Sequence, residues 1–156
     1  MLNTAHSQAP SAVRDEVLRQ HEILRDLLHR AINRTTATVQ RPRGDTLELA
    51  HMVHEIRRCF RAHVSFEERV LVPVLASTDG WGPERVRNLL EEHALQRQQL
   101  DALLDGLEAG WERARLAAVV RALAADILRD MAEEERDYLG PELLDDWVVI
   151  GGTRRE

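Results

Sequence analysis

The sequence predicts an all-α protein, an up-down-up-down four-helix bundle with a short C-terminal tail. Apolar residues recur at alternating steps of three and four through four long segments, which is the period of a helix that buries one face. Short breaks rich in glycine, proline and threonine separate the segments. Aromatic residues make up 4% of the chain and charged residues 31%, which favours helices packed through Leu, Ala and Val over a β-sandwich.

The length of 156 residues is enough for one domain with a core of its own. We expect a flexible N-terminus over residues 1–10, the bundle over 11–140 and a tail over 141–156. The tail begins with a short apolar stretch that can pack on the bundle, and we expect its end to fray.

The first two helices have recognisable boundaries. Ser11 is placed to cap the N-terminus of the first, and the β-branched, Gly and Pro residues of 33–44 are expected to end it. Asp45 is expected to cap the second helix, with Glu48 at the position that completes a capping box. The turn residues of 77–83 then end the second helix.

The last two helices are bounded in the same way. Pro83 suits the first turn of the third helix, and Gly110 suits its C-terminal end. The fourth helix is predicted over about 111–138, before the break at Gly140 and Pro141.

Charge and composition exclude several classes of function. The net charge of −6 leaves no basic patch for phosphates, which argues against a nucleic-acid partner. No apolar run is long enough to span a membrane, and the N-terminus does not resemble a secretory leader, so we expect a cytoplasmic protein with no membrane partner. Because Cys59 is the only cysteine, any metal must be held by His and carboxylate side chains.

The predicted core-facing stripes of all four helices contain polar residues. In the second helix the stripe reads Leu49, Val53, Ile56, Phe60, His63, Glu67, Val70 and Val74. The first helix has His21 in its stripe, the third has His93, and the fourth has Asp130 and Glu134. A lone histidine on an apolar face is more often a hydrogen-bonded core residue than a ligand. It is the coincidence in four helices that points to a shared site.

A metal ion explains these polar positions. Buried carboxylates without partners cost several kcal/mol each, and no Lys or Arg shares their stripes. His63 with Glu67, and Asp130 with Glu134, stand at i and i+4, so each pair projects from one helical face. Carboxylates can bridge two metals, so three His and three carboxylates suit a two-metal site. Nitrogen and oxygen donors favour iron, with manganese or zinc as alternatives.

In neighbouring helices of an antiparallel bundle, residues equally far from the connecting loop lie side by side. The candidate ligands meet this condition except for His21 and His63. His21 lies about 11 residues before the predicted loop at 33–44, whereas His63 lies about 18 residues after Asp45. For His21 and His63 to lie side by side, the loop would have to run along the second helix for part of its length.

At these residues the sequence resembles the hemerythrin-like family, also called HHE cation-binding domains, over about 15–140. The stretches that carry the resemblance are "LRQHEILRDLL", "HVSFEERVLVPVL" and "EEHALQRQQL". The resemblance implies a non-heme diiron centre, bridged by oxygen and carboxylates, that binds O2 or reacts with peroxide or nitric oxide. The ligands it implies are His21, His63, Glu67, His93 and Glu134.

Two departures from the family pattern bear on function. Where the family repeats H-x-x-x-E in the fourth helix, this chain has "DMAEEERDYL", with Asp130 in the histidine position. Asp130 can ligate iron as a further oxygen donor, or the site can be reduced to one iron. Arg97 replaces the second histidine of the oxygen carriers, which favours redox chemistry, sensing or metal storage over oxygen carriage. Tyr138, one turn after Glu134, is a candidate hydrogen-bond donor beside the metal, or a residue packed at the bundle end.

Three hypotheses therefore stand on the sequence. The first is a diiron protein that binds or reduces small oxidants, namely O2, peroxide or nitric oxide; whether it turns them over as an enzyme is left open. The second is an iron- or oxygen-sensing regulatory or interaction module without turnover. The third is a metal-free bundle whose inward polar residues fix helix register. The sequence identifies no protein partner.

Overall fold

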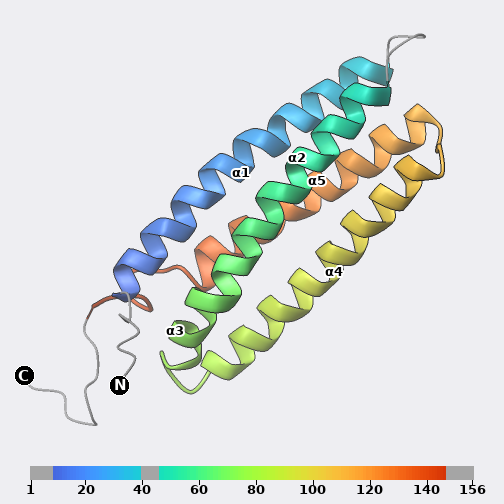
Figure 1. Cartoon of the computed structure of the whole chain (residues 1–156). Coiled ribbons are helices and arrows are strands. Elements are labelled where there is room, and N and C mark those ends of the chain that lie inside the picture. The colour runs from blue at the N-terminus through green and yellow to red at the C-terminus, as the bar shows by residue number, and fades with distance from the viewer. Residues whose placement is uncertain (1–8, 40–45, 147–156) are drawn as a thin grey trace, which may run out of the picture.

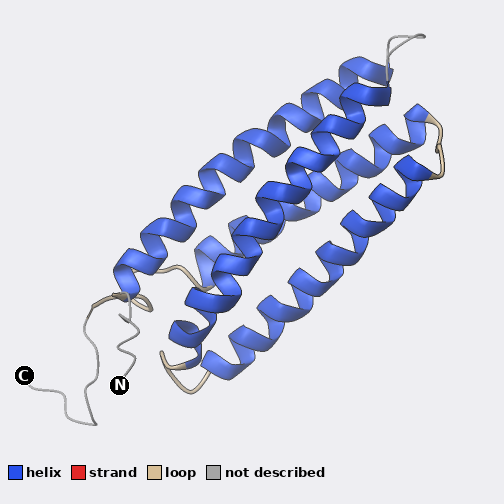
Figure 2. Ribbon diagram, in the orientation of Figure 1, coloured by secondary structure: helices blue, strands red, loops and turns tan. Residues whose placement is uncertain are grey.

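The computed structural model describes residues 9–39 and 46–146, and these contain helices and loops but no β-strand (Figure 2). The elements are α1 (Pro10–Val39), α2 (Thr46–Phe66), the π-helical segment η1 (Glu67–Leu71), α3 (Val72–Ala76), α4 (Gly82–Glu108) and α5 (Arg113–Asp137). Because α2, η1 and α3 follow one another without a break, they act as one long helix. The result is the predicted all-α four-helix bundle (Figure 1).

The four long helices contact one another in a closed ring. α1 packs against α2 on one side and α5 on the other, while α4 lies against α5 and against α2 and α3. Figure 1 shows successive helices running in opposite directions, with the α3–α4 and α4–α5 connections at opposite ends. Each helix therefore turns one stripe of side chains toward the same central axis.

The apolar core has two parts, one at each end of the bundle. The larger cluster includes Phe60 and Met131, and the smaller includes Leu71 and Leu139. Along the chain, Glu134 lies between Met131, the last residue of the larger cluster, and Leu139, a residue of the smaller cluster just after α5. In the other three long helices, buried His or Glu residues likewise lie between the two clusters. A polar layer therefore divides the core.

The first helix is longer than its sequence predicts. α1 continues through 33–39, so the prediction of a loop there is wrong. The hydroxyl of Thr35 donates to the carbonyl oxygens of Ala31 and Ile32, at 2.9 and 2.8 Å, which lets a β-branched polar residue remain helical and buried. The longer helix also removes the mismatch in height: His21 is as far from Val39 as His63 is from Thr46, within one residue.

The N-terminal end of α1 is tied to the C-terminal segment. The helix begins at Pro10, and Ser11 lies inside it, so its predicted role as N-cap is wrong. Instead, the Ser11 hydroxyl donates to Oδ2 of Asp146 at 2.7 Å and its backbone N–H donates to Oδ1 at 3.0 Å. Leu144 is buried in the smaller cluster, which anchors this stretch. The predicted cap Asp45, most of the expected flexible N-terminus (1–8) and the tail beyond 146 lie outside the described residues.

The remaining helix boundaries agree with expectation. The second long helix ends at Ala76, and Pro83 lies in the first turn of α4. Gly110, just after the end of α4, has φ of 70°, a left-handed conformation that favours glycine. No described helix combines the length and the apolar character that crossing a membrane requires.

The second long helix changes its hydrogen-bonding pattern at Glu67. The N–H of Val72 bonds to the carbonyl oxygen of Glu67, five residues back, which widens this turn. Pro73 follows, and proline both lacks an N–H and clashes with the carbonyl four residues earlier in an α-helix. The wider turn accommodates the proline without ending the helix. It also begins at a candidate metal ligand, as π-turns often do at functional sites.

Gly82, the first residue of α4, packs directly against the backbone at the end of α3. A Cβ atom there would lie 2.3 Å from the carbonyl oxygen of Leu75 and 2.8 Å from that of Ala76. Since backbone atoms must move to relieve this clash, we expect Gly82→Ala to lower the free energy of unfolding by about 1–3 kcal/mol. Denaturant unfolding measures the change. Gly80→Ala is the matched control, because nothing lies within 4 Å of its added Cβ, and an equal loss in both variants would contradict the prediction.

Candidate metal centre

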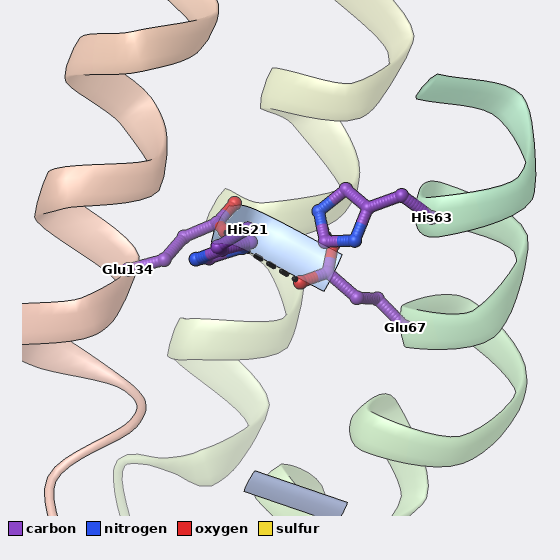
Figure 3. Close-up of side chains that lie close together, drawn as sticks. All are labelled: His21, His63, Glu67 and Glu134. Carbon is purple, nitrogen blue, oxygen red and sulfur yellow. Dashed lines mark ion pairs between the residues drawn. The ribbon is translucent and has the colours of Figure 1, made fainter. Parts of the chain in front are cut away.

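Five titratable side chains meet in the polar layer. They come from all four long helices, and each is at most 5% exposed: His21 on α1, His63 on α2, Glu67 at the start of η1, His93 on α4 and Glu134 on α5. Figure 3 shows His63 and Glu67 reaching toward Glu134 from the opposite side of the bundle, with His21 between them. These are five of the six residues that the sequence predicts as ligands.

Four of these side chains form a group compact enough to hold one ion. One ligand atom from each of His21, His63, Glu67 and Glu134 lies within 4.8 Å of the others. The ring centroids of His21 and His63 are 4.9 Å apart and nearly edge to face. Two imidazoles and two carboxylates are donors that iron, manganese and zinc all accept.

The two glutamates each face histidines on two sides. Oε1 of Glu67 is 3.6 Å from Nε2 of His21, while its Oε2 is 3.1 Å from Nε2 of His93. Oε2 of Glu134 is 3.2 Å from Nε2 of His21, and its Oε1 is 3.9 Å from Nε2 of His93. Both carboxylates therefore turn one oxygen toward His21 and the other toward His93. Oε2 of Glu67 is also 3.4 Å from Nε2 of His63.

Several atoms at the centre of this group lack hydrogen-bond partners. Nε2 of His21, both oxygens of Glu67 and Oε2 of Glu134 are buried and make no hydrogen bond. Polar atoms left in this condition cost free energy unless another group satisfies them. A cation placed among them would satisfy all four, so the donor set fits a metal centre.

The outer nitrogen of each histidine is held by an acceptor. Nδ1 of His21 bonds to Oε1 of Glu135 at 2.9 Å, and Arg25 donates to the same oxygen at 2.6 Å. Nδ1 of His93 bonds to Glu68 at 3.2 Å, and Arg97 donates to that carboxylate at 2.7 Å. Because carboxylates accept, these contacts place a proton on Nδ1 and turn Nε2 inward, where it can bind a metal once any proton on it is displaced.

His63 is oriented by a neutral partner instead. Its Nδ1 donates to Oε1 of Gln20 at 3.2 Å, and Nε2 of Gln20 donates to Glu16 at 2.7 Å. The bond to Glu16 fixes which end of the amide faces His63. His63 is thus the one of the three central imidazoles that no carboxylate holds at Nδ1.

These outer contacts follow a repeated pattern that sequence reasoning missed. Arg25 and Arg97 each stand four residues after a central histidine, and Glu68 and Glu135 each follow directly after a central glutamate. The sequence predicts Glu68 and Glu135 as groups that support the ligands or lie at the surface, and Arg97 only as the replacement for a histidine. It gives Arg25 and Gln20 no part in the site. The i, i+4 His–Arg spacing in two helices is a signal that could have found the arginines.

Asp130 occupies the place on α5 that His63 occupies on α2, four residues before the central glutamate. It lies outside the four-residue group. Its Oδ2 accepts a hydrogen bond from Nε2 of Gln96 at 2.5 Å, and Arg129 lies 3.3 Å from its Oδ1. Its side chain is 15% exposed, more than any of the five central residues.

A small cavity lies beside His93 and Asp130. Polar groups of His63, Gln96 and Glu134 also line it, and apolar side chains close the rest. Its volume is about 10 Å³, which is about the space that one water molecule requires. This side of the centre therefore has room for one very small ligand.

Tyr138 lies just after the last residue of α5, one turn beyond Glu134. Its hydroxyl interacts with the Asn88 side chain, and burial followed by the charge of Glu92 raises its pKa. Its ring packs against the smaller apolar cluster. These contacts are those of a residue at the end of the bundle, and the proposed role beside a metal stays a prediction.

The central groups strongly perturb one another's pKa values. Burial opposes the charged form of His21, but the carboxylates of Glu134 and Glu67 outweigh it and raise its pKa to about 10. Burial and the charge of Glu67 raise the pKa of Glu134 to about 7, while burial lowers that of His63 to about 4. A metal would have to displace the protons that His21 and Glu134 hold near neutral pH.

These shifts predict how the metal-free protein responds to alkali. A raised folded-state pKa stabilises the fold below the ordinary value, and that stability disappears as the pH rises through the folded value. For Glu134 the loss occurs up to about pH 7 and for His21 between about pH 6.5 and 10. We expect the Tm of chelator-treated protein to fall from pH 7 to 10, and to fall less in His21→Gln. Equal slopes in both proteins would contradict this explanation.

The comparisons with known proteins agree with this geometry. The family model described as Hemerythrin HHE cation binding domain matches residues 12–142. The match includes nearly all of the four long helices and every candidate ligand. No curated protein and no solved structure is significantly similar to the chain.

Proposed function

Because the chain belongs to the hemerythrin family of HHE cation-binding domains, we propose that it holds two iron ions and binds or reduces a small oxidant. Family membership and the compact His and Glu group support metal binding. The observation that carries the proposal of two ions is the orientation of Glu67 and Glu134. Each directs one oxygen to His21 and the other to His93, as carboxylates that bridge two metals must do.

The two halves of the proposed centre differ in their donors. His21 and His63, with one oxygen from each glutamate, would hold the first iron. His93 and the opposite oxygens would hold the second, and Asp130 is a further carboxylate at the small cavity beside His93. To ligate, Asp130 would have to exchange its bond to Gln96 for one to the metal. The second half thus has fewer strong protein donors and more room.

The surrounding residues supply the conditions for chemistry with small oxidants. Iron in such a centre supplies reversible ligand binding or electrons to O2, peroxide or nitric oxide. The apolar clusters on both sides exclude bulk water, and the cavity beside His93 limits the ligand to a few atoms. Gln96 places an amide N–H at that cavity, where it can donate to a bound ligand. Manganese or zinc would fit the same donors but would not give the same electron transfer.

Anaerobic loading with Fe(II), followed by rapid mixing with peroxide or nitric oxide, tests the proposal. We expect an oxo-to-iron(III) absorption band after peroxide and a stoichiometric iron-nitrosyl signal with nitric oxide. Asp130→His restores the histidine that the family has at this position. It should therefore raise the affinity for the second iron and leave the affinity for the first unchanged. Iron-loaded wild-type protein that gives neither signal would overturn the proposed reactivity.

A second candidate function is an iron- or oxygen-sensing module without turnover. The observation that favours it is that the unpartnered central atoms come from α1, η1 and α5, so metal occupancy ties three of the four long helices together. Loss of metal would then change the stability of the whole bundle, which a partner protein could read. Iron-dependent partner binding without peroxide consumption would support this function over the first. A cytoplasmic location and the absence of nucleic-acid and membrane partners stay predictions from the sequence.

A further inference from the structure

A second and larger cavity, between α1 and α2, also borders His63. Its volume is about 250 Å³, and it opens to solvent through a surface that includes Ile23, which is 51% exposed. Leu24, Cys59 and Ala62 line it, and the buried His63 with its partner Gln20 lies at its inner end. We call this cavity the α1–α2 groove.

The wall of the α1–α2 groove is mainly apolar, and the charge at its rim is neutralised. Apolar atoms contribute most of its exposed lining. Among the described residues that line it, Arg19 alone carries a charge, and its guanidinium is paired with Glu16 through contacts of 2.8 and 2.6 Å. A neutral, weakly hydrated molecule can enter such a groove more easily than an ion, because an ion would lose hydration without a partner.

The ring of His63 separates this groove from the small cavity at the centre. His63 lines both spaces, with its outer nitrogen toward Gln20 and its Nε2 toward Glu67. Its partner at Nδ1 is the neutral Gln20 amide, at 3.2 Å, whereas His21 and His93 are each held by a carboxylate. Between the groove and the centre stand the His63 ring and the Gln20 amide. Because the amide is neutral, it can move away from His63 without breaking an ion pair.

We propose that the α1–α2 groove is the entrance through which neutral diatomic molecules reach the metal centre, passing the edge of the His63 ring beside Gln20. This inference rests on the proposed function, since it requires a metal that binds such molecules. Gln20 is then a positioning residue with two tasks: it orients His63 and forms the inner boundary of the entrance.

Ala62→Leu tests the entrance because Ala62 is exposed, lies in the groove wall and precedes His63 without being a candidate ligand. The matched control is Ala94→Leu, which is also exposed and adjacent to a central histidine but does not line the groove. Stopped-flow mixing of the anaerobic Fe(II) protein with nitric oxide gives the association rate constant, and trapping of released ligand gives the dissociation rate constant.

The leucine side chain must move off its preferred rotamer for each passage, so we expect both rate constants to fall about five- to tenfold in Ala62→Leu. Since both fall together, the Kd stays unchanged, as does the iron content. Ala94→Leu should match the wild type. An unchanged association rate in Ala62→Leu would overturn the proposal and indicate entry past Asp130. A wild type that binds no iron would instead contradict the proposed function.

Discussion

Replacing Glu67 with glutamine is expected to abolish stable metal binding, with a loss of affinity greater than about 100-fold. Glu67 contributes an oxygen to each half of the proposed centre, and the neutral amide is a much weaker ligand. Its side chain is fully buried and makes no hydrogen bond, so the isosteric change leaves packing intact. Metal analysis after dialysis, together with a competition titration, measures the effect.

The matched control for this variant is the next residue. Glu68→Gln keeps the same shape and position in the helix, but Glu68 contacts Nδ1 of His93 and Arg97 rather than the central space. We expect about a tenfold loss of affinity there, which is typical of a residue that orients a ligand. Equal losses in the two variants would indicate that both act through the fold, and retention of metal by Glu67→Gln would exclude it as a bridge.

Removing the metal from the wild-type protein is expected to lower Tm by about 8–16 °C. An ion that binds only the folded state at a thousand times its Kd stabilises that state by about 4 kcal/mol, and in a chain of this length each kcal/mol corresponds to about 2–4 °C. The physical cause is the set of buried, unpartnered atoms on His21, Glu67 and Glu134. Calorimetry of the loaded and chelator-treated protein gives the shift.

Glu67→Gln again supplies the control for this shift. Without metal, the wild-type chain buries two carboxylates near each other, and the charge of Glu67 helps to raise the pKa of Glu134. The variant lacks this repulsion, but it also loses the attraction between the Glu67 carboxylate and the histidines, which outweighs burial and lowers the pKa of Glu67 to about 2. Its metal-free form should therefore be no more stable than the metal-free wild type, and it should not respond to added iron. A variant that still gains stability with iron would place the metal elsewhere.

The helical fold and the inward placement of the central residues could both be predicted from the sequence. The three-and-four spacing placed His21, His93 and Glu134 on inward faces, and the structure finds all three buried in one layer. This succeeded because a buried face imposes a strict period on a helix, and a polar residue within that period is conspicuous. The family resemblance also agrees with the family match over 12–142.

Other features depend on contacts that no spacing rule reveals. The extension of α1 depends on Thr35 satisfying its hydroxyl within the helix, against its preference for strands and turns. The π-turn at Glu67 depends on how Pro73 is accommodated in tertiary context. The role of Gln20 depends on which end of its amide faces His63, and Glu16 decides this across one helical turn.

The most direct test of the account is the number of metal ions bound per chain, measured by anaerobic Fe(II) titration of the metal-free wild-type protein. Glu67 and Glu134 turned between His21 and His93 predict two equivalents, the second weaker than the first because Asp130 stands where a histidine would complete its half. A single equivalent in the wild type would contradict the bridging role of the two carboxylates. No bound iron would contradict the metal centre itself.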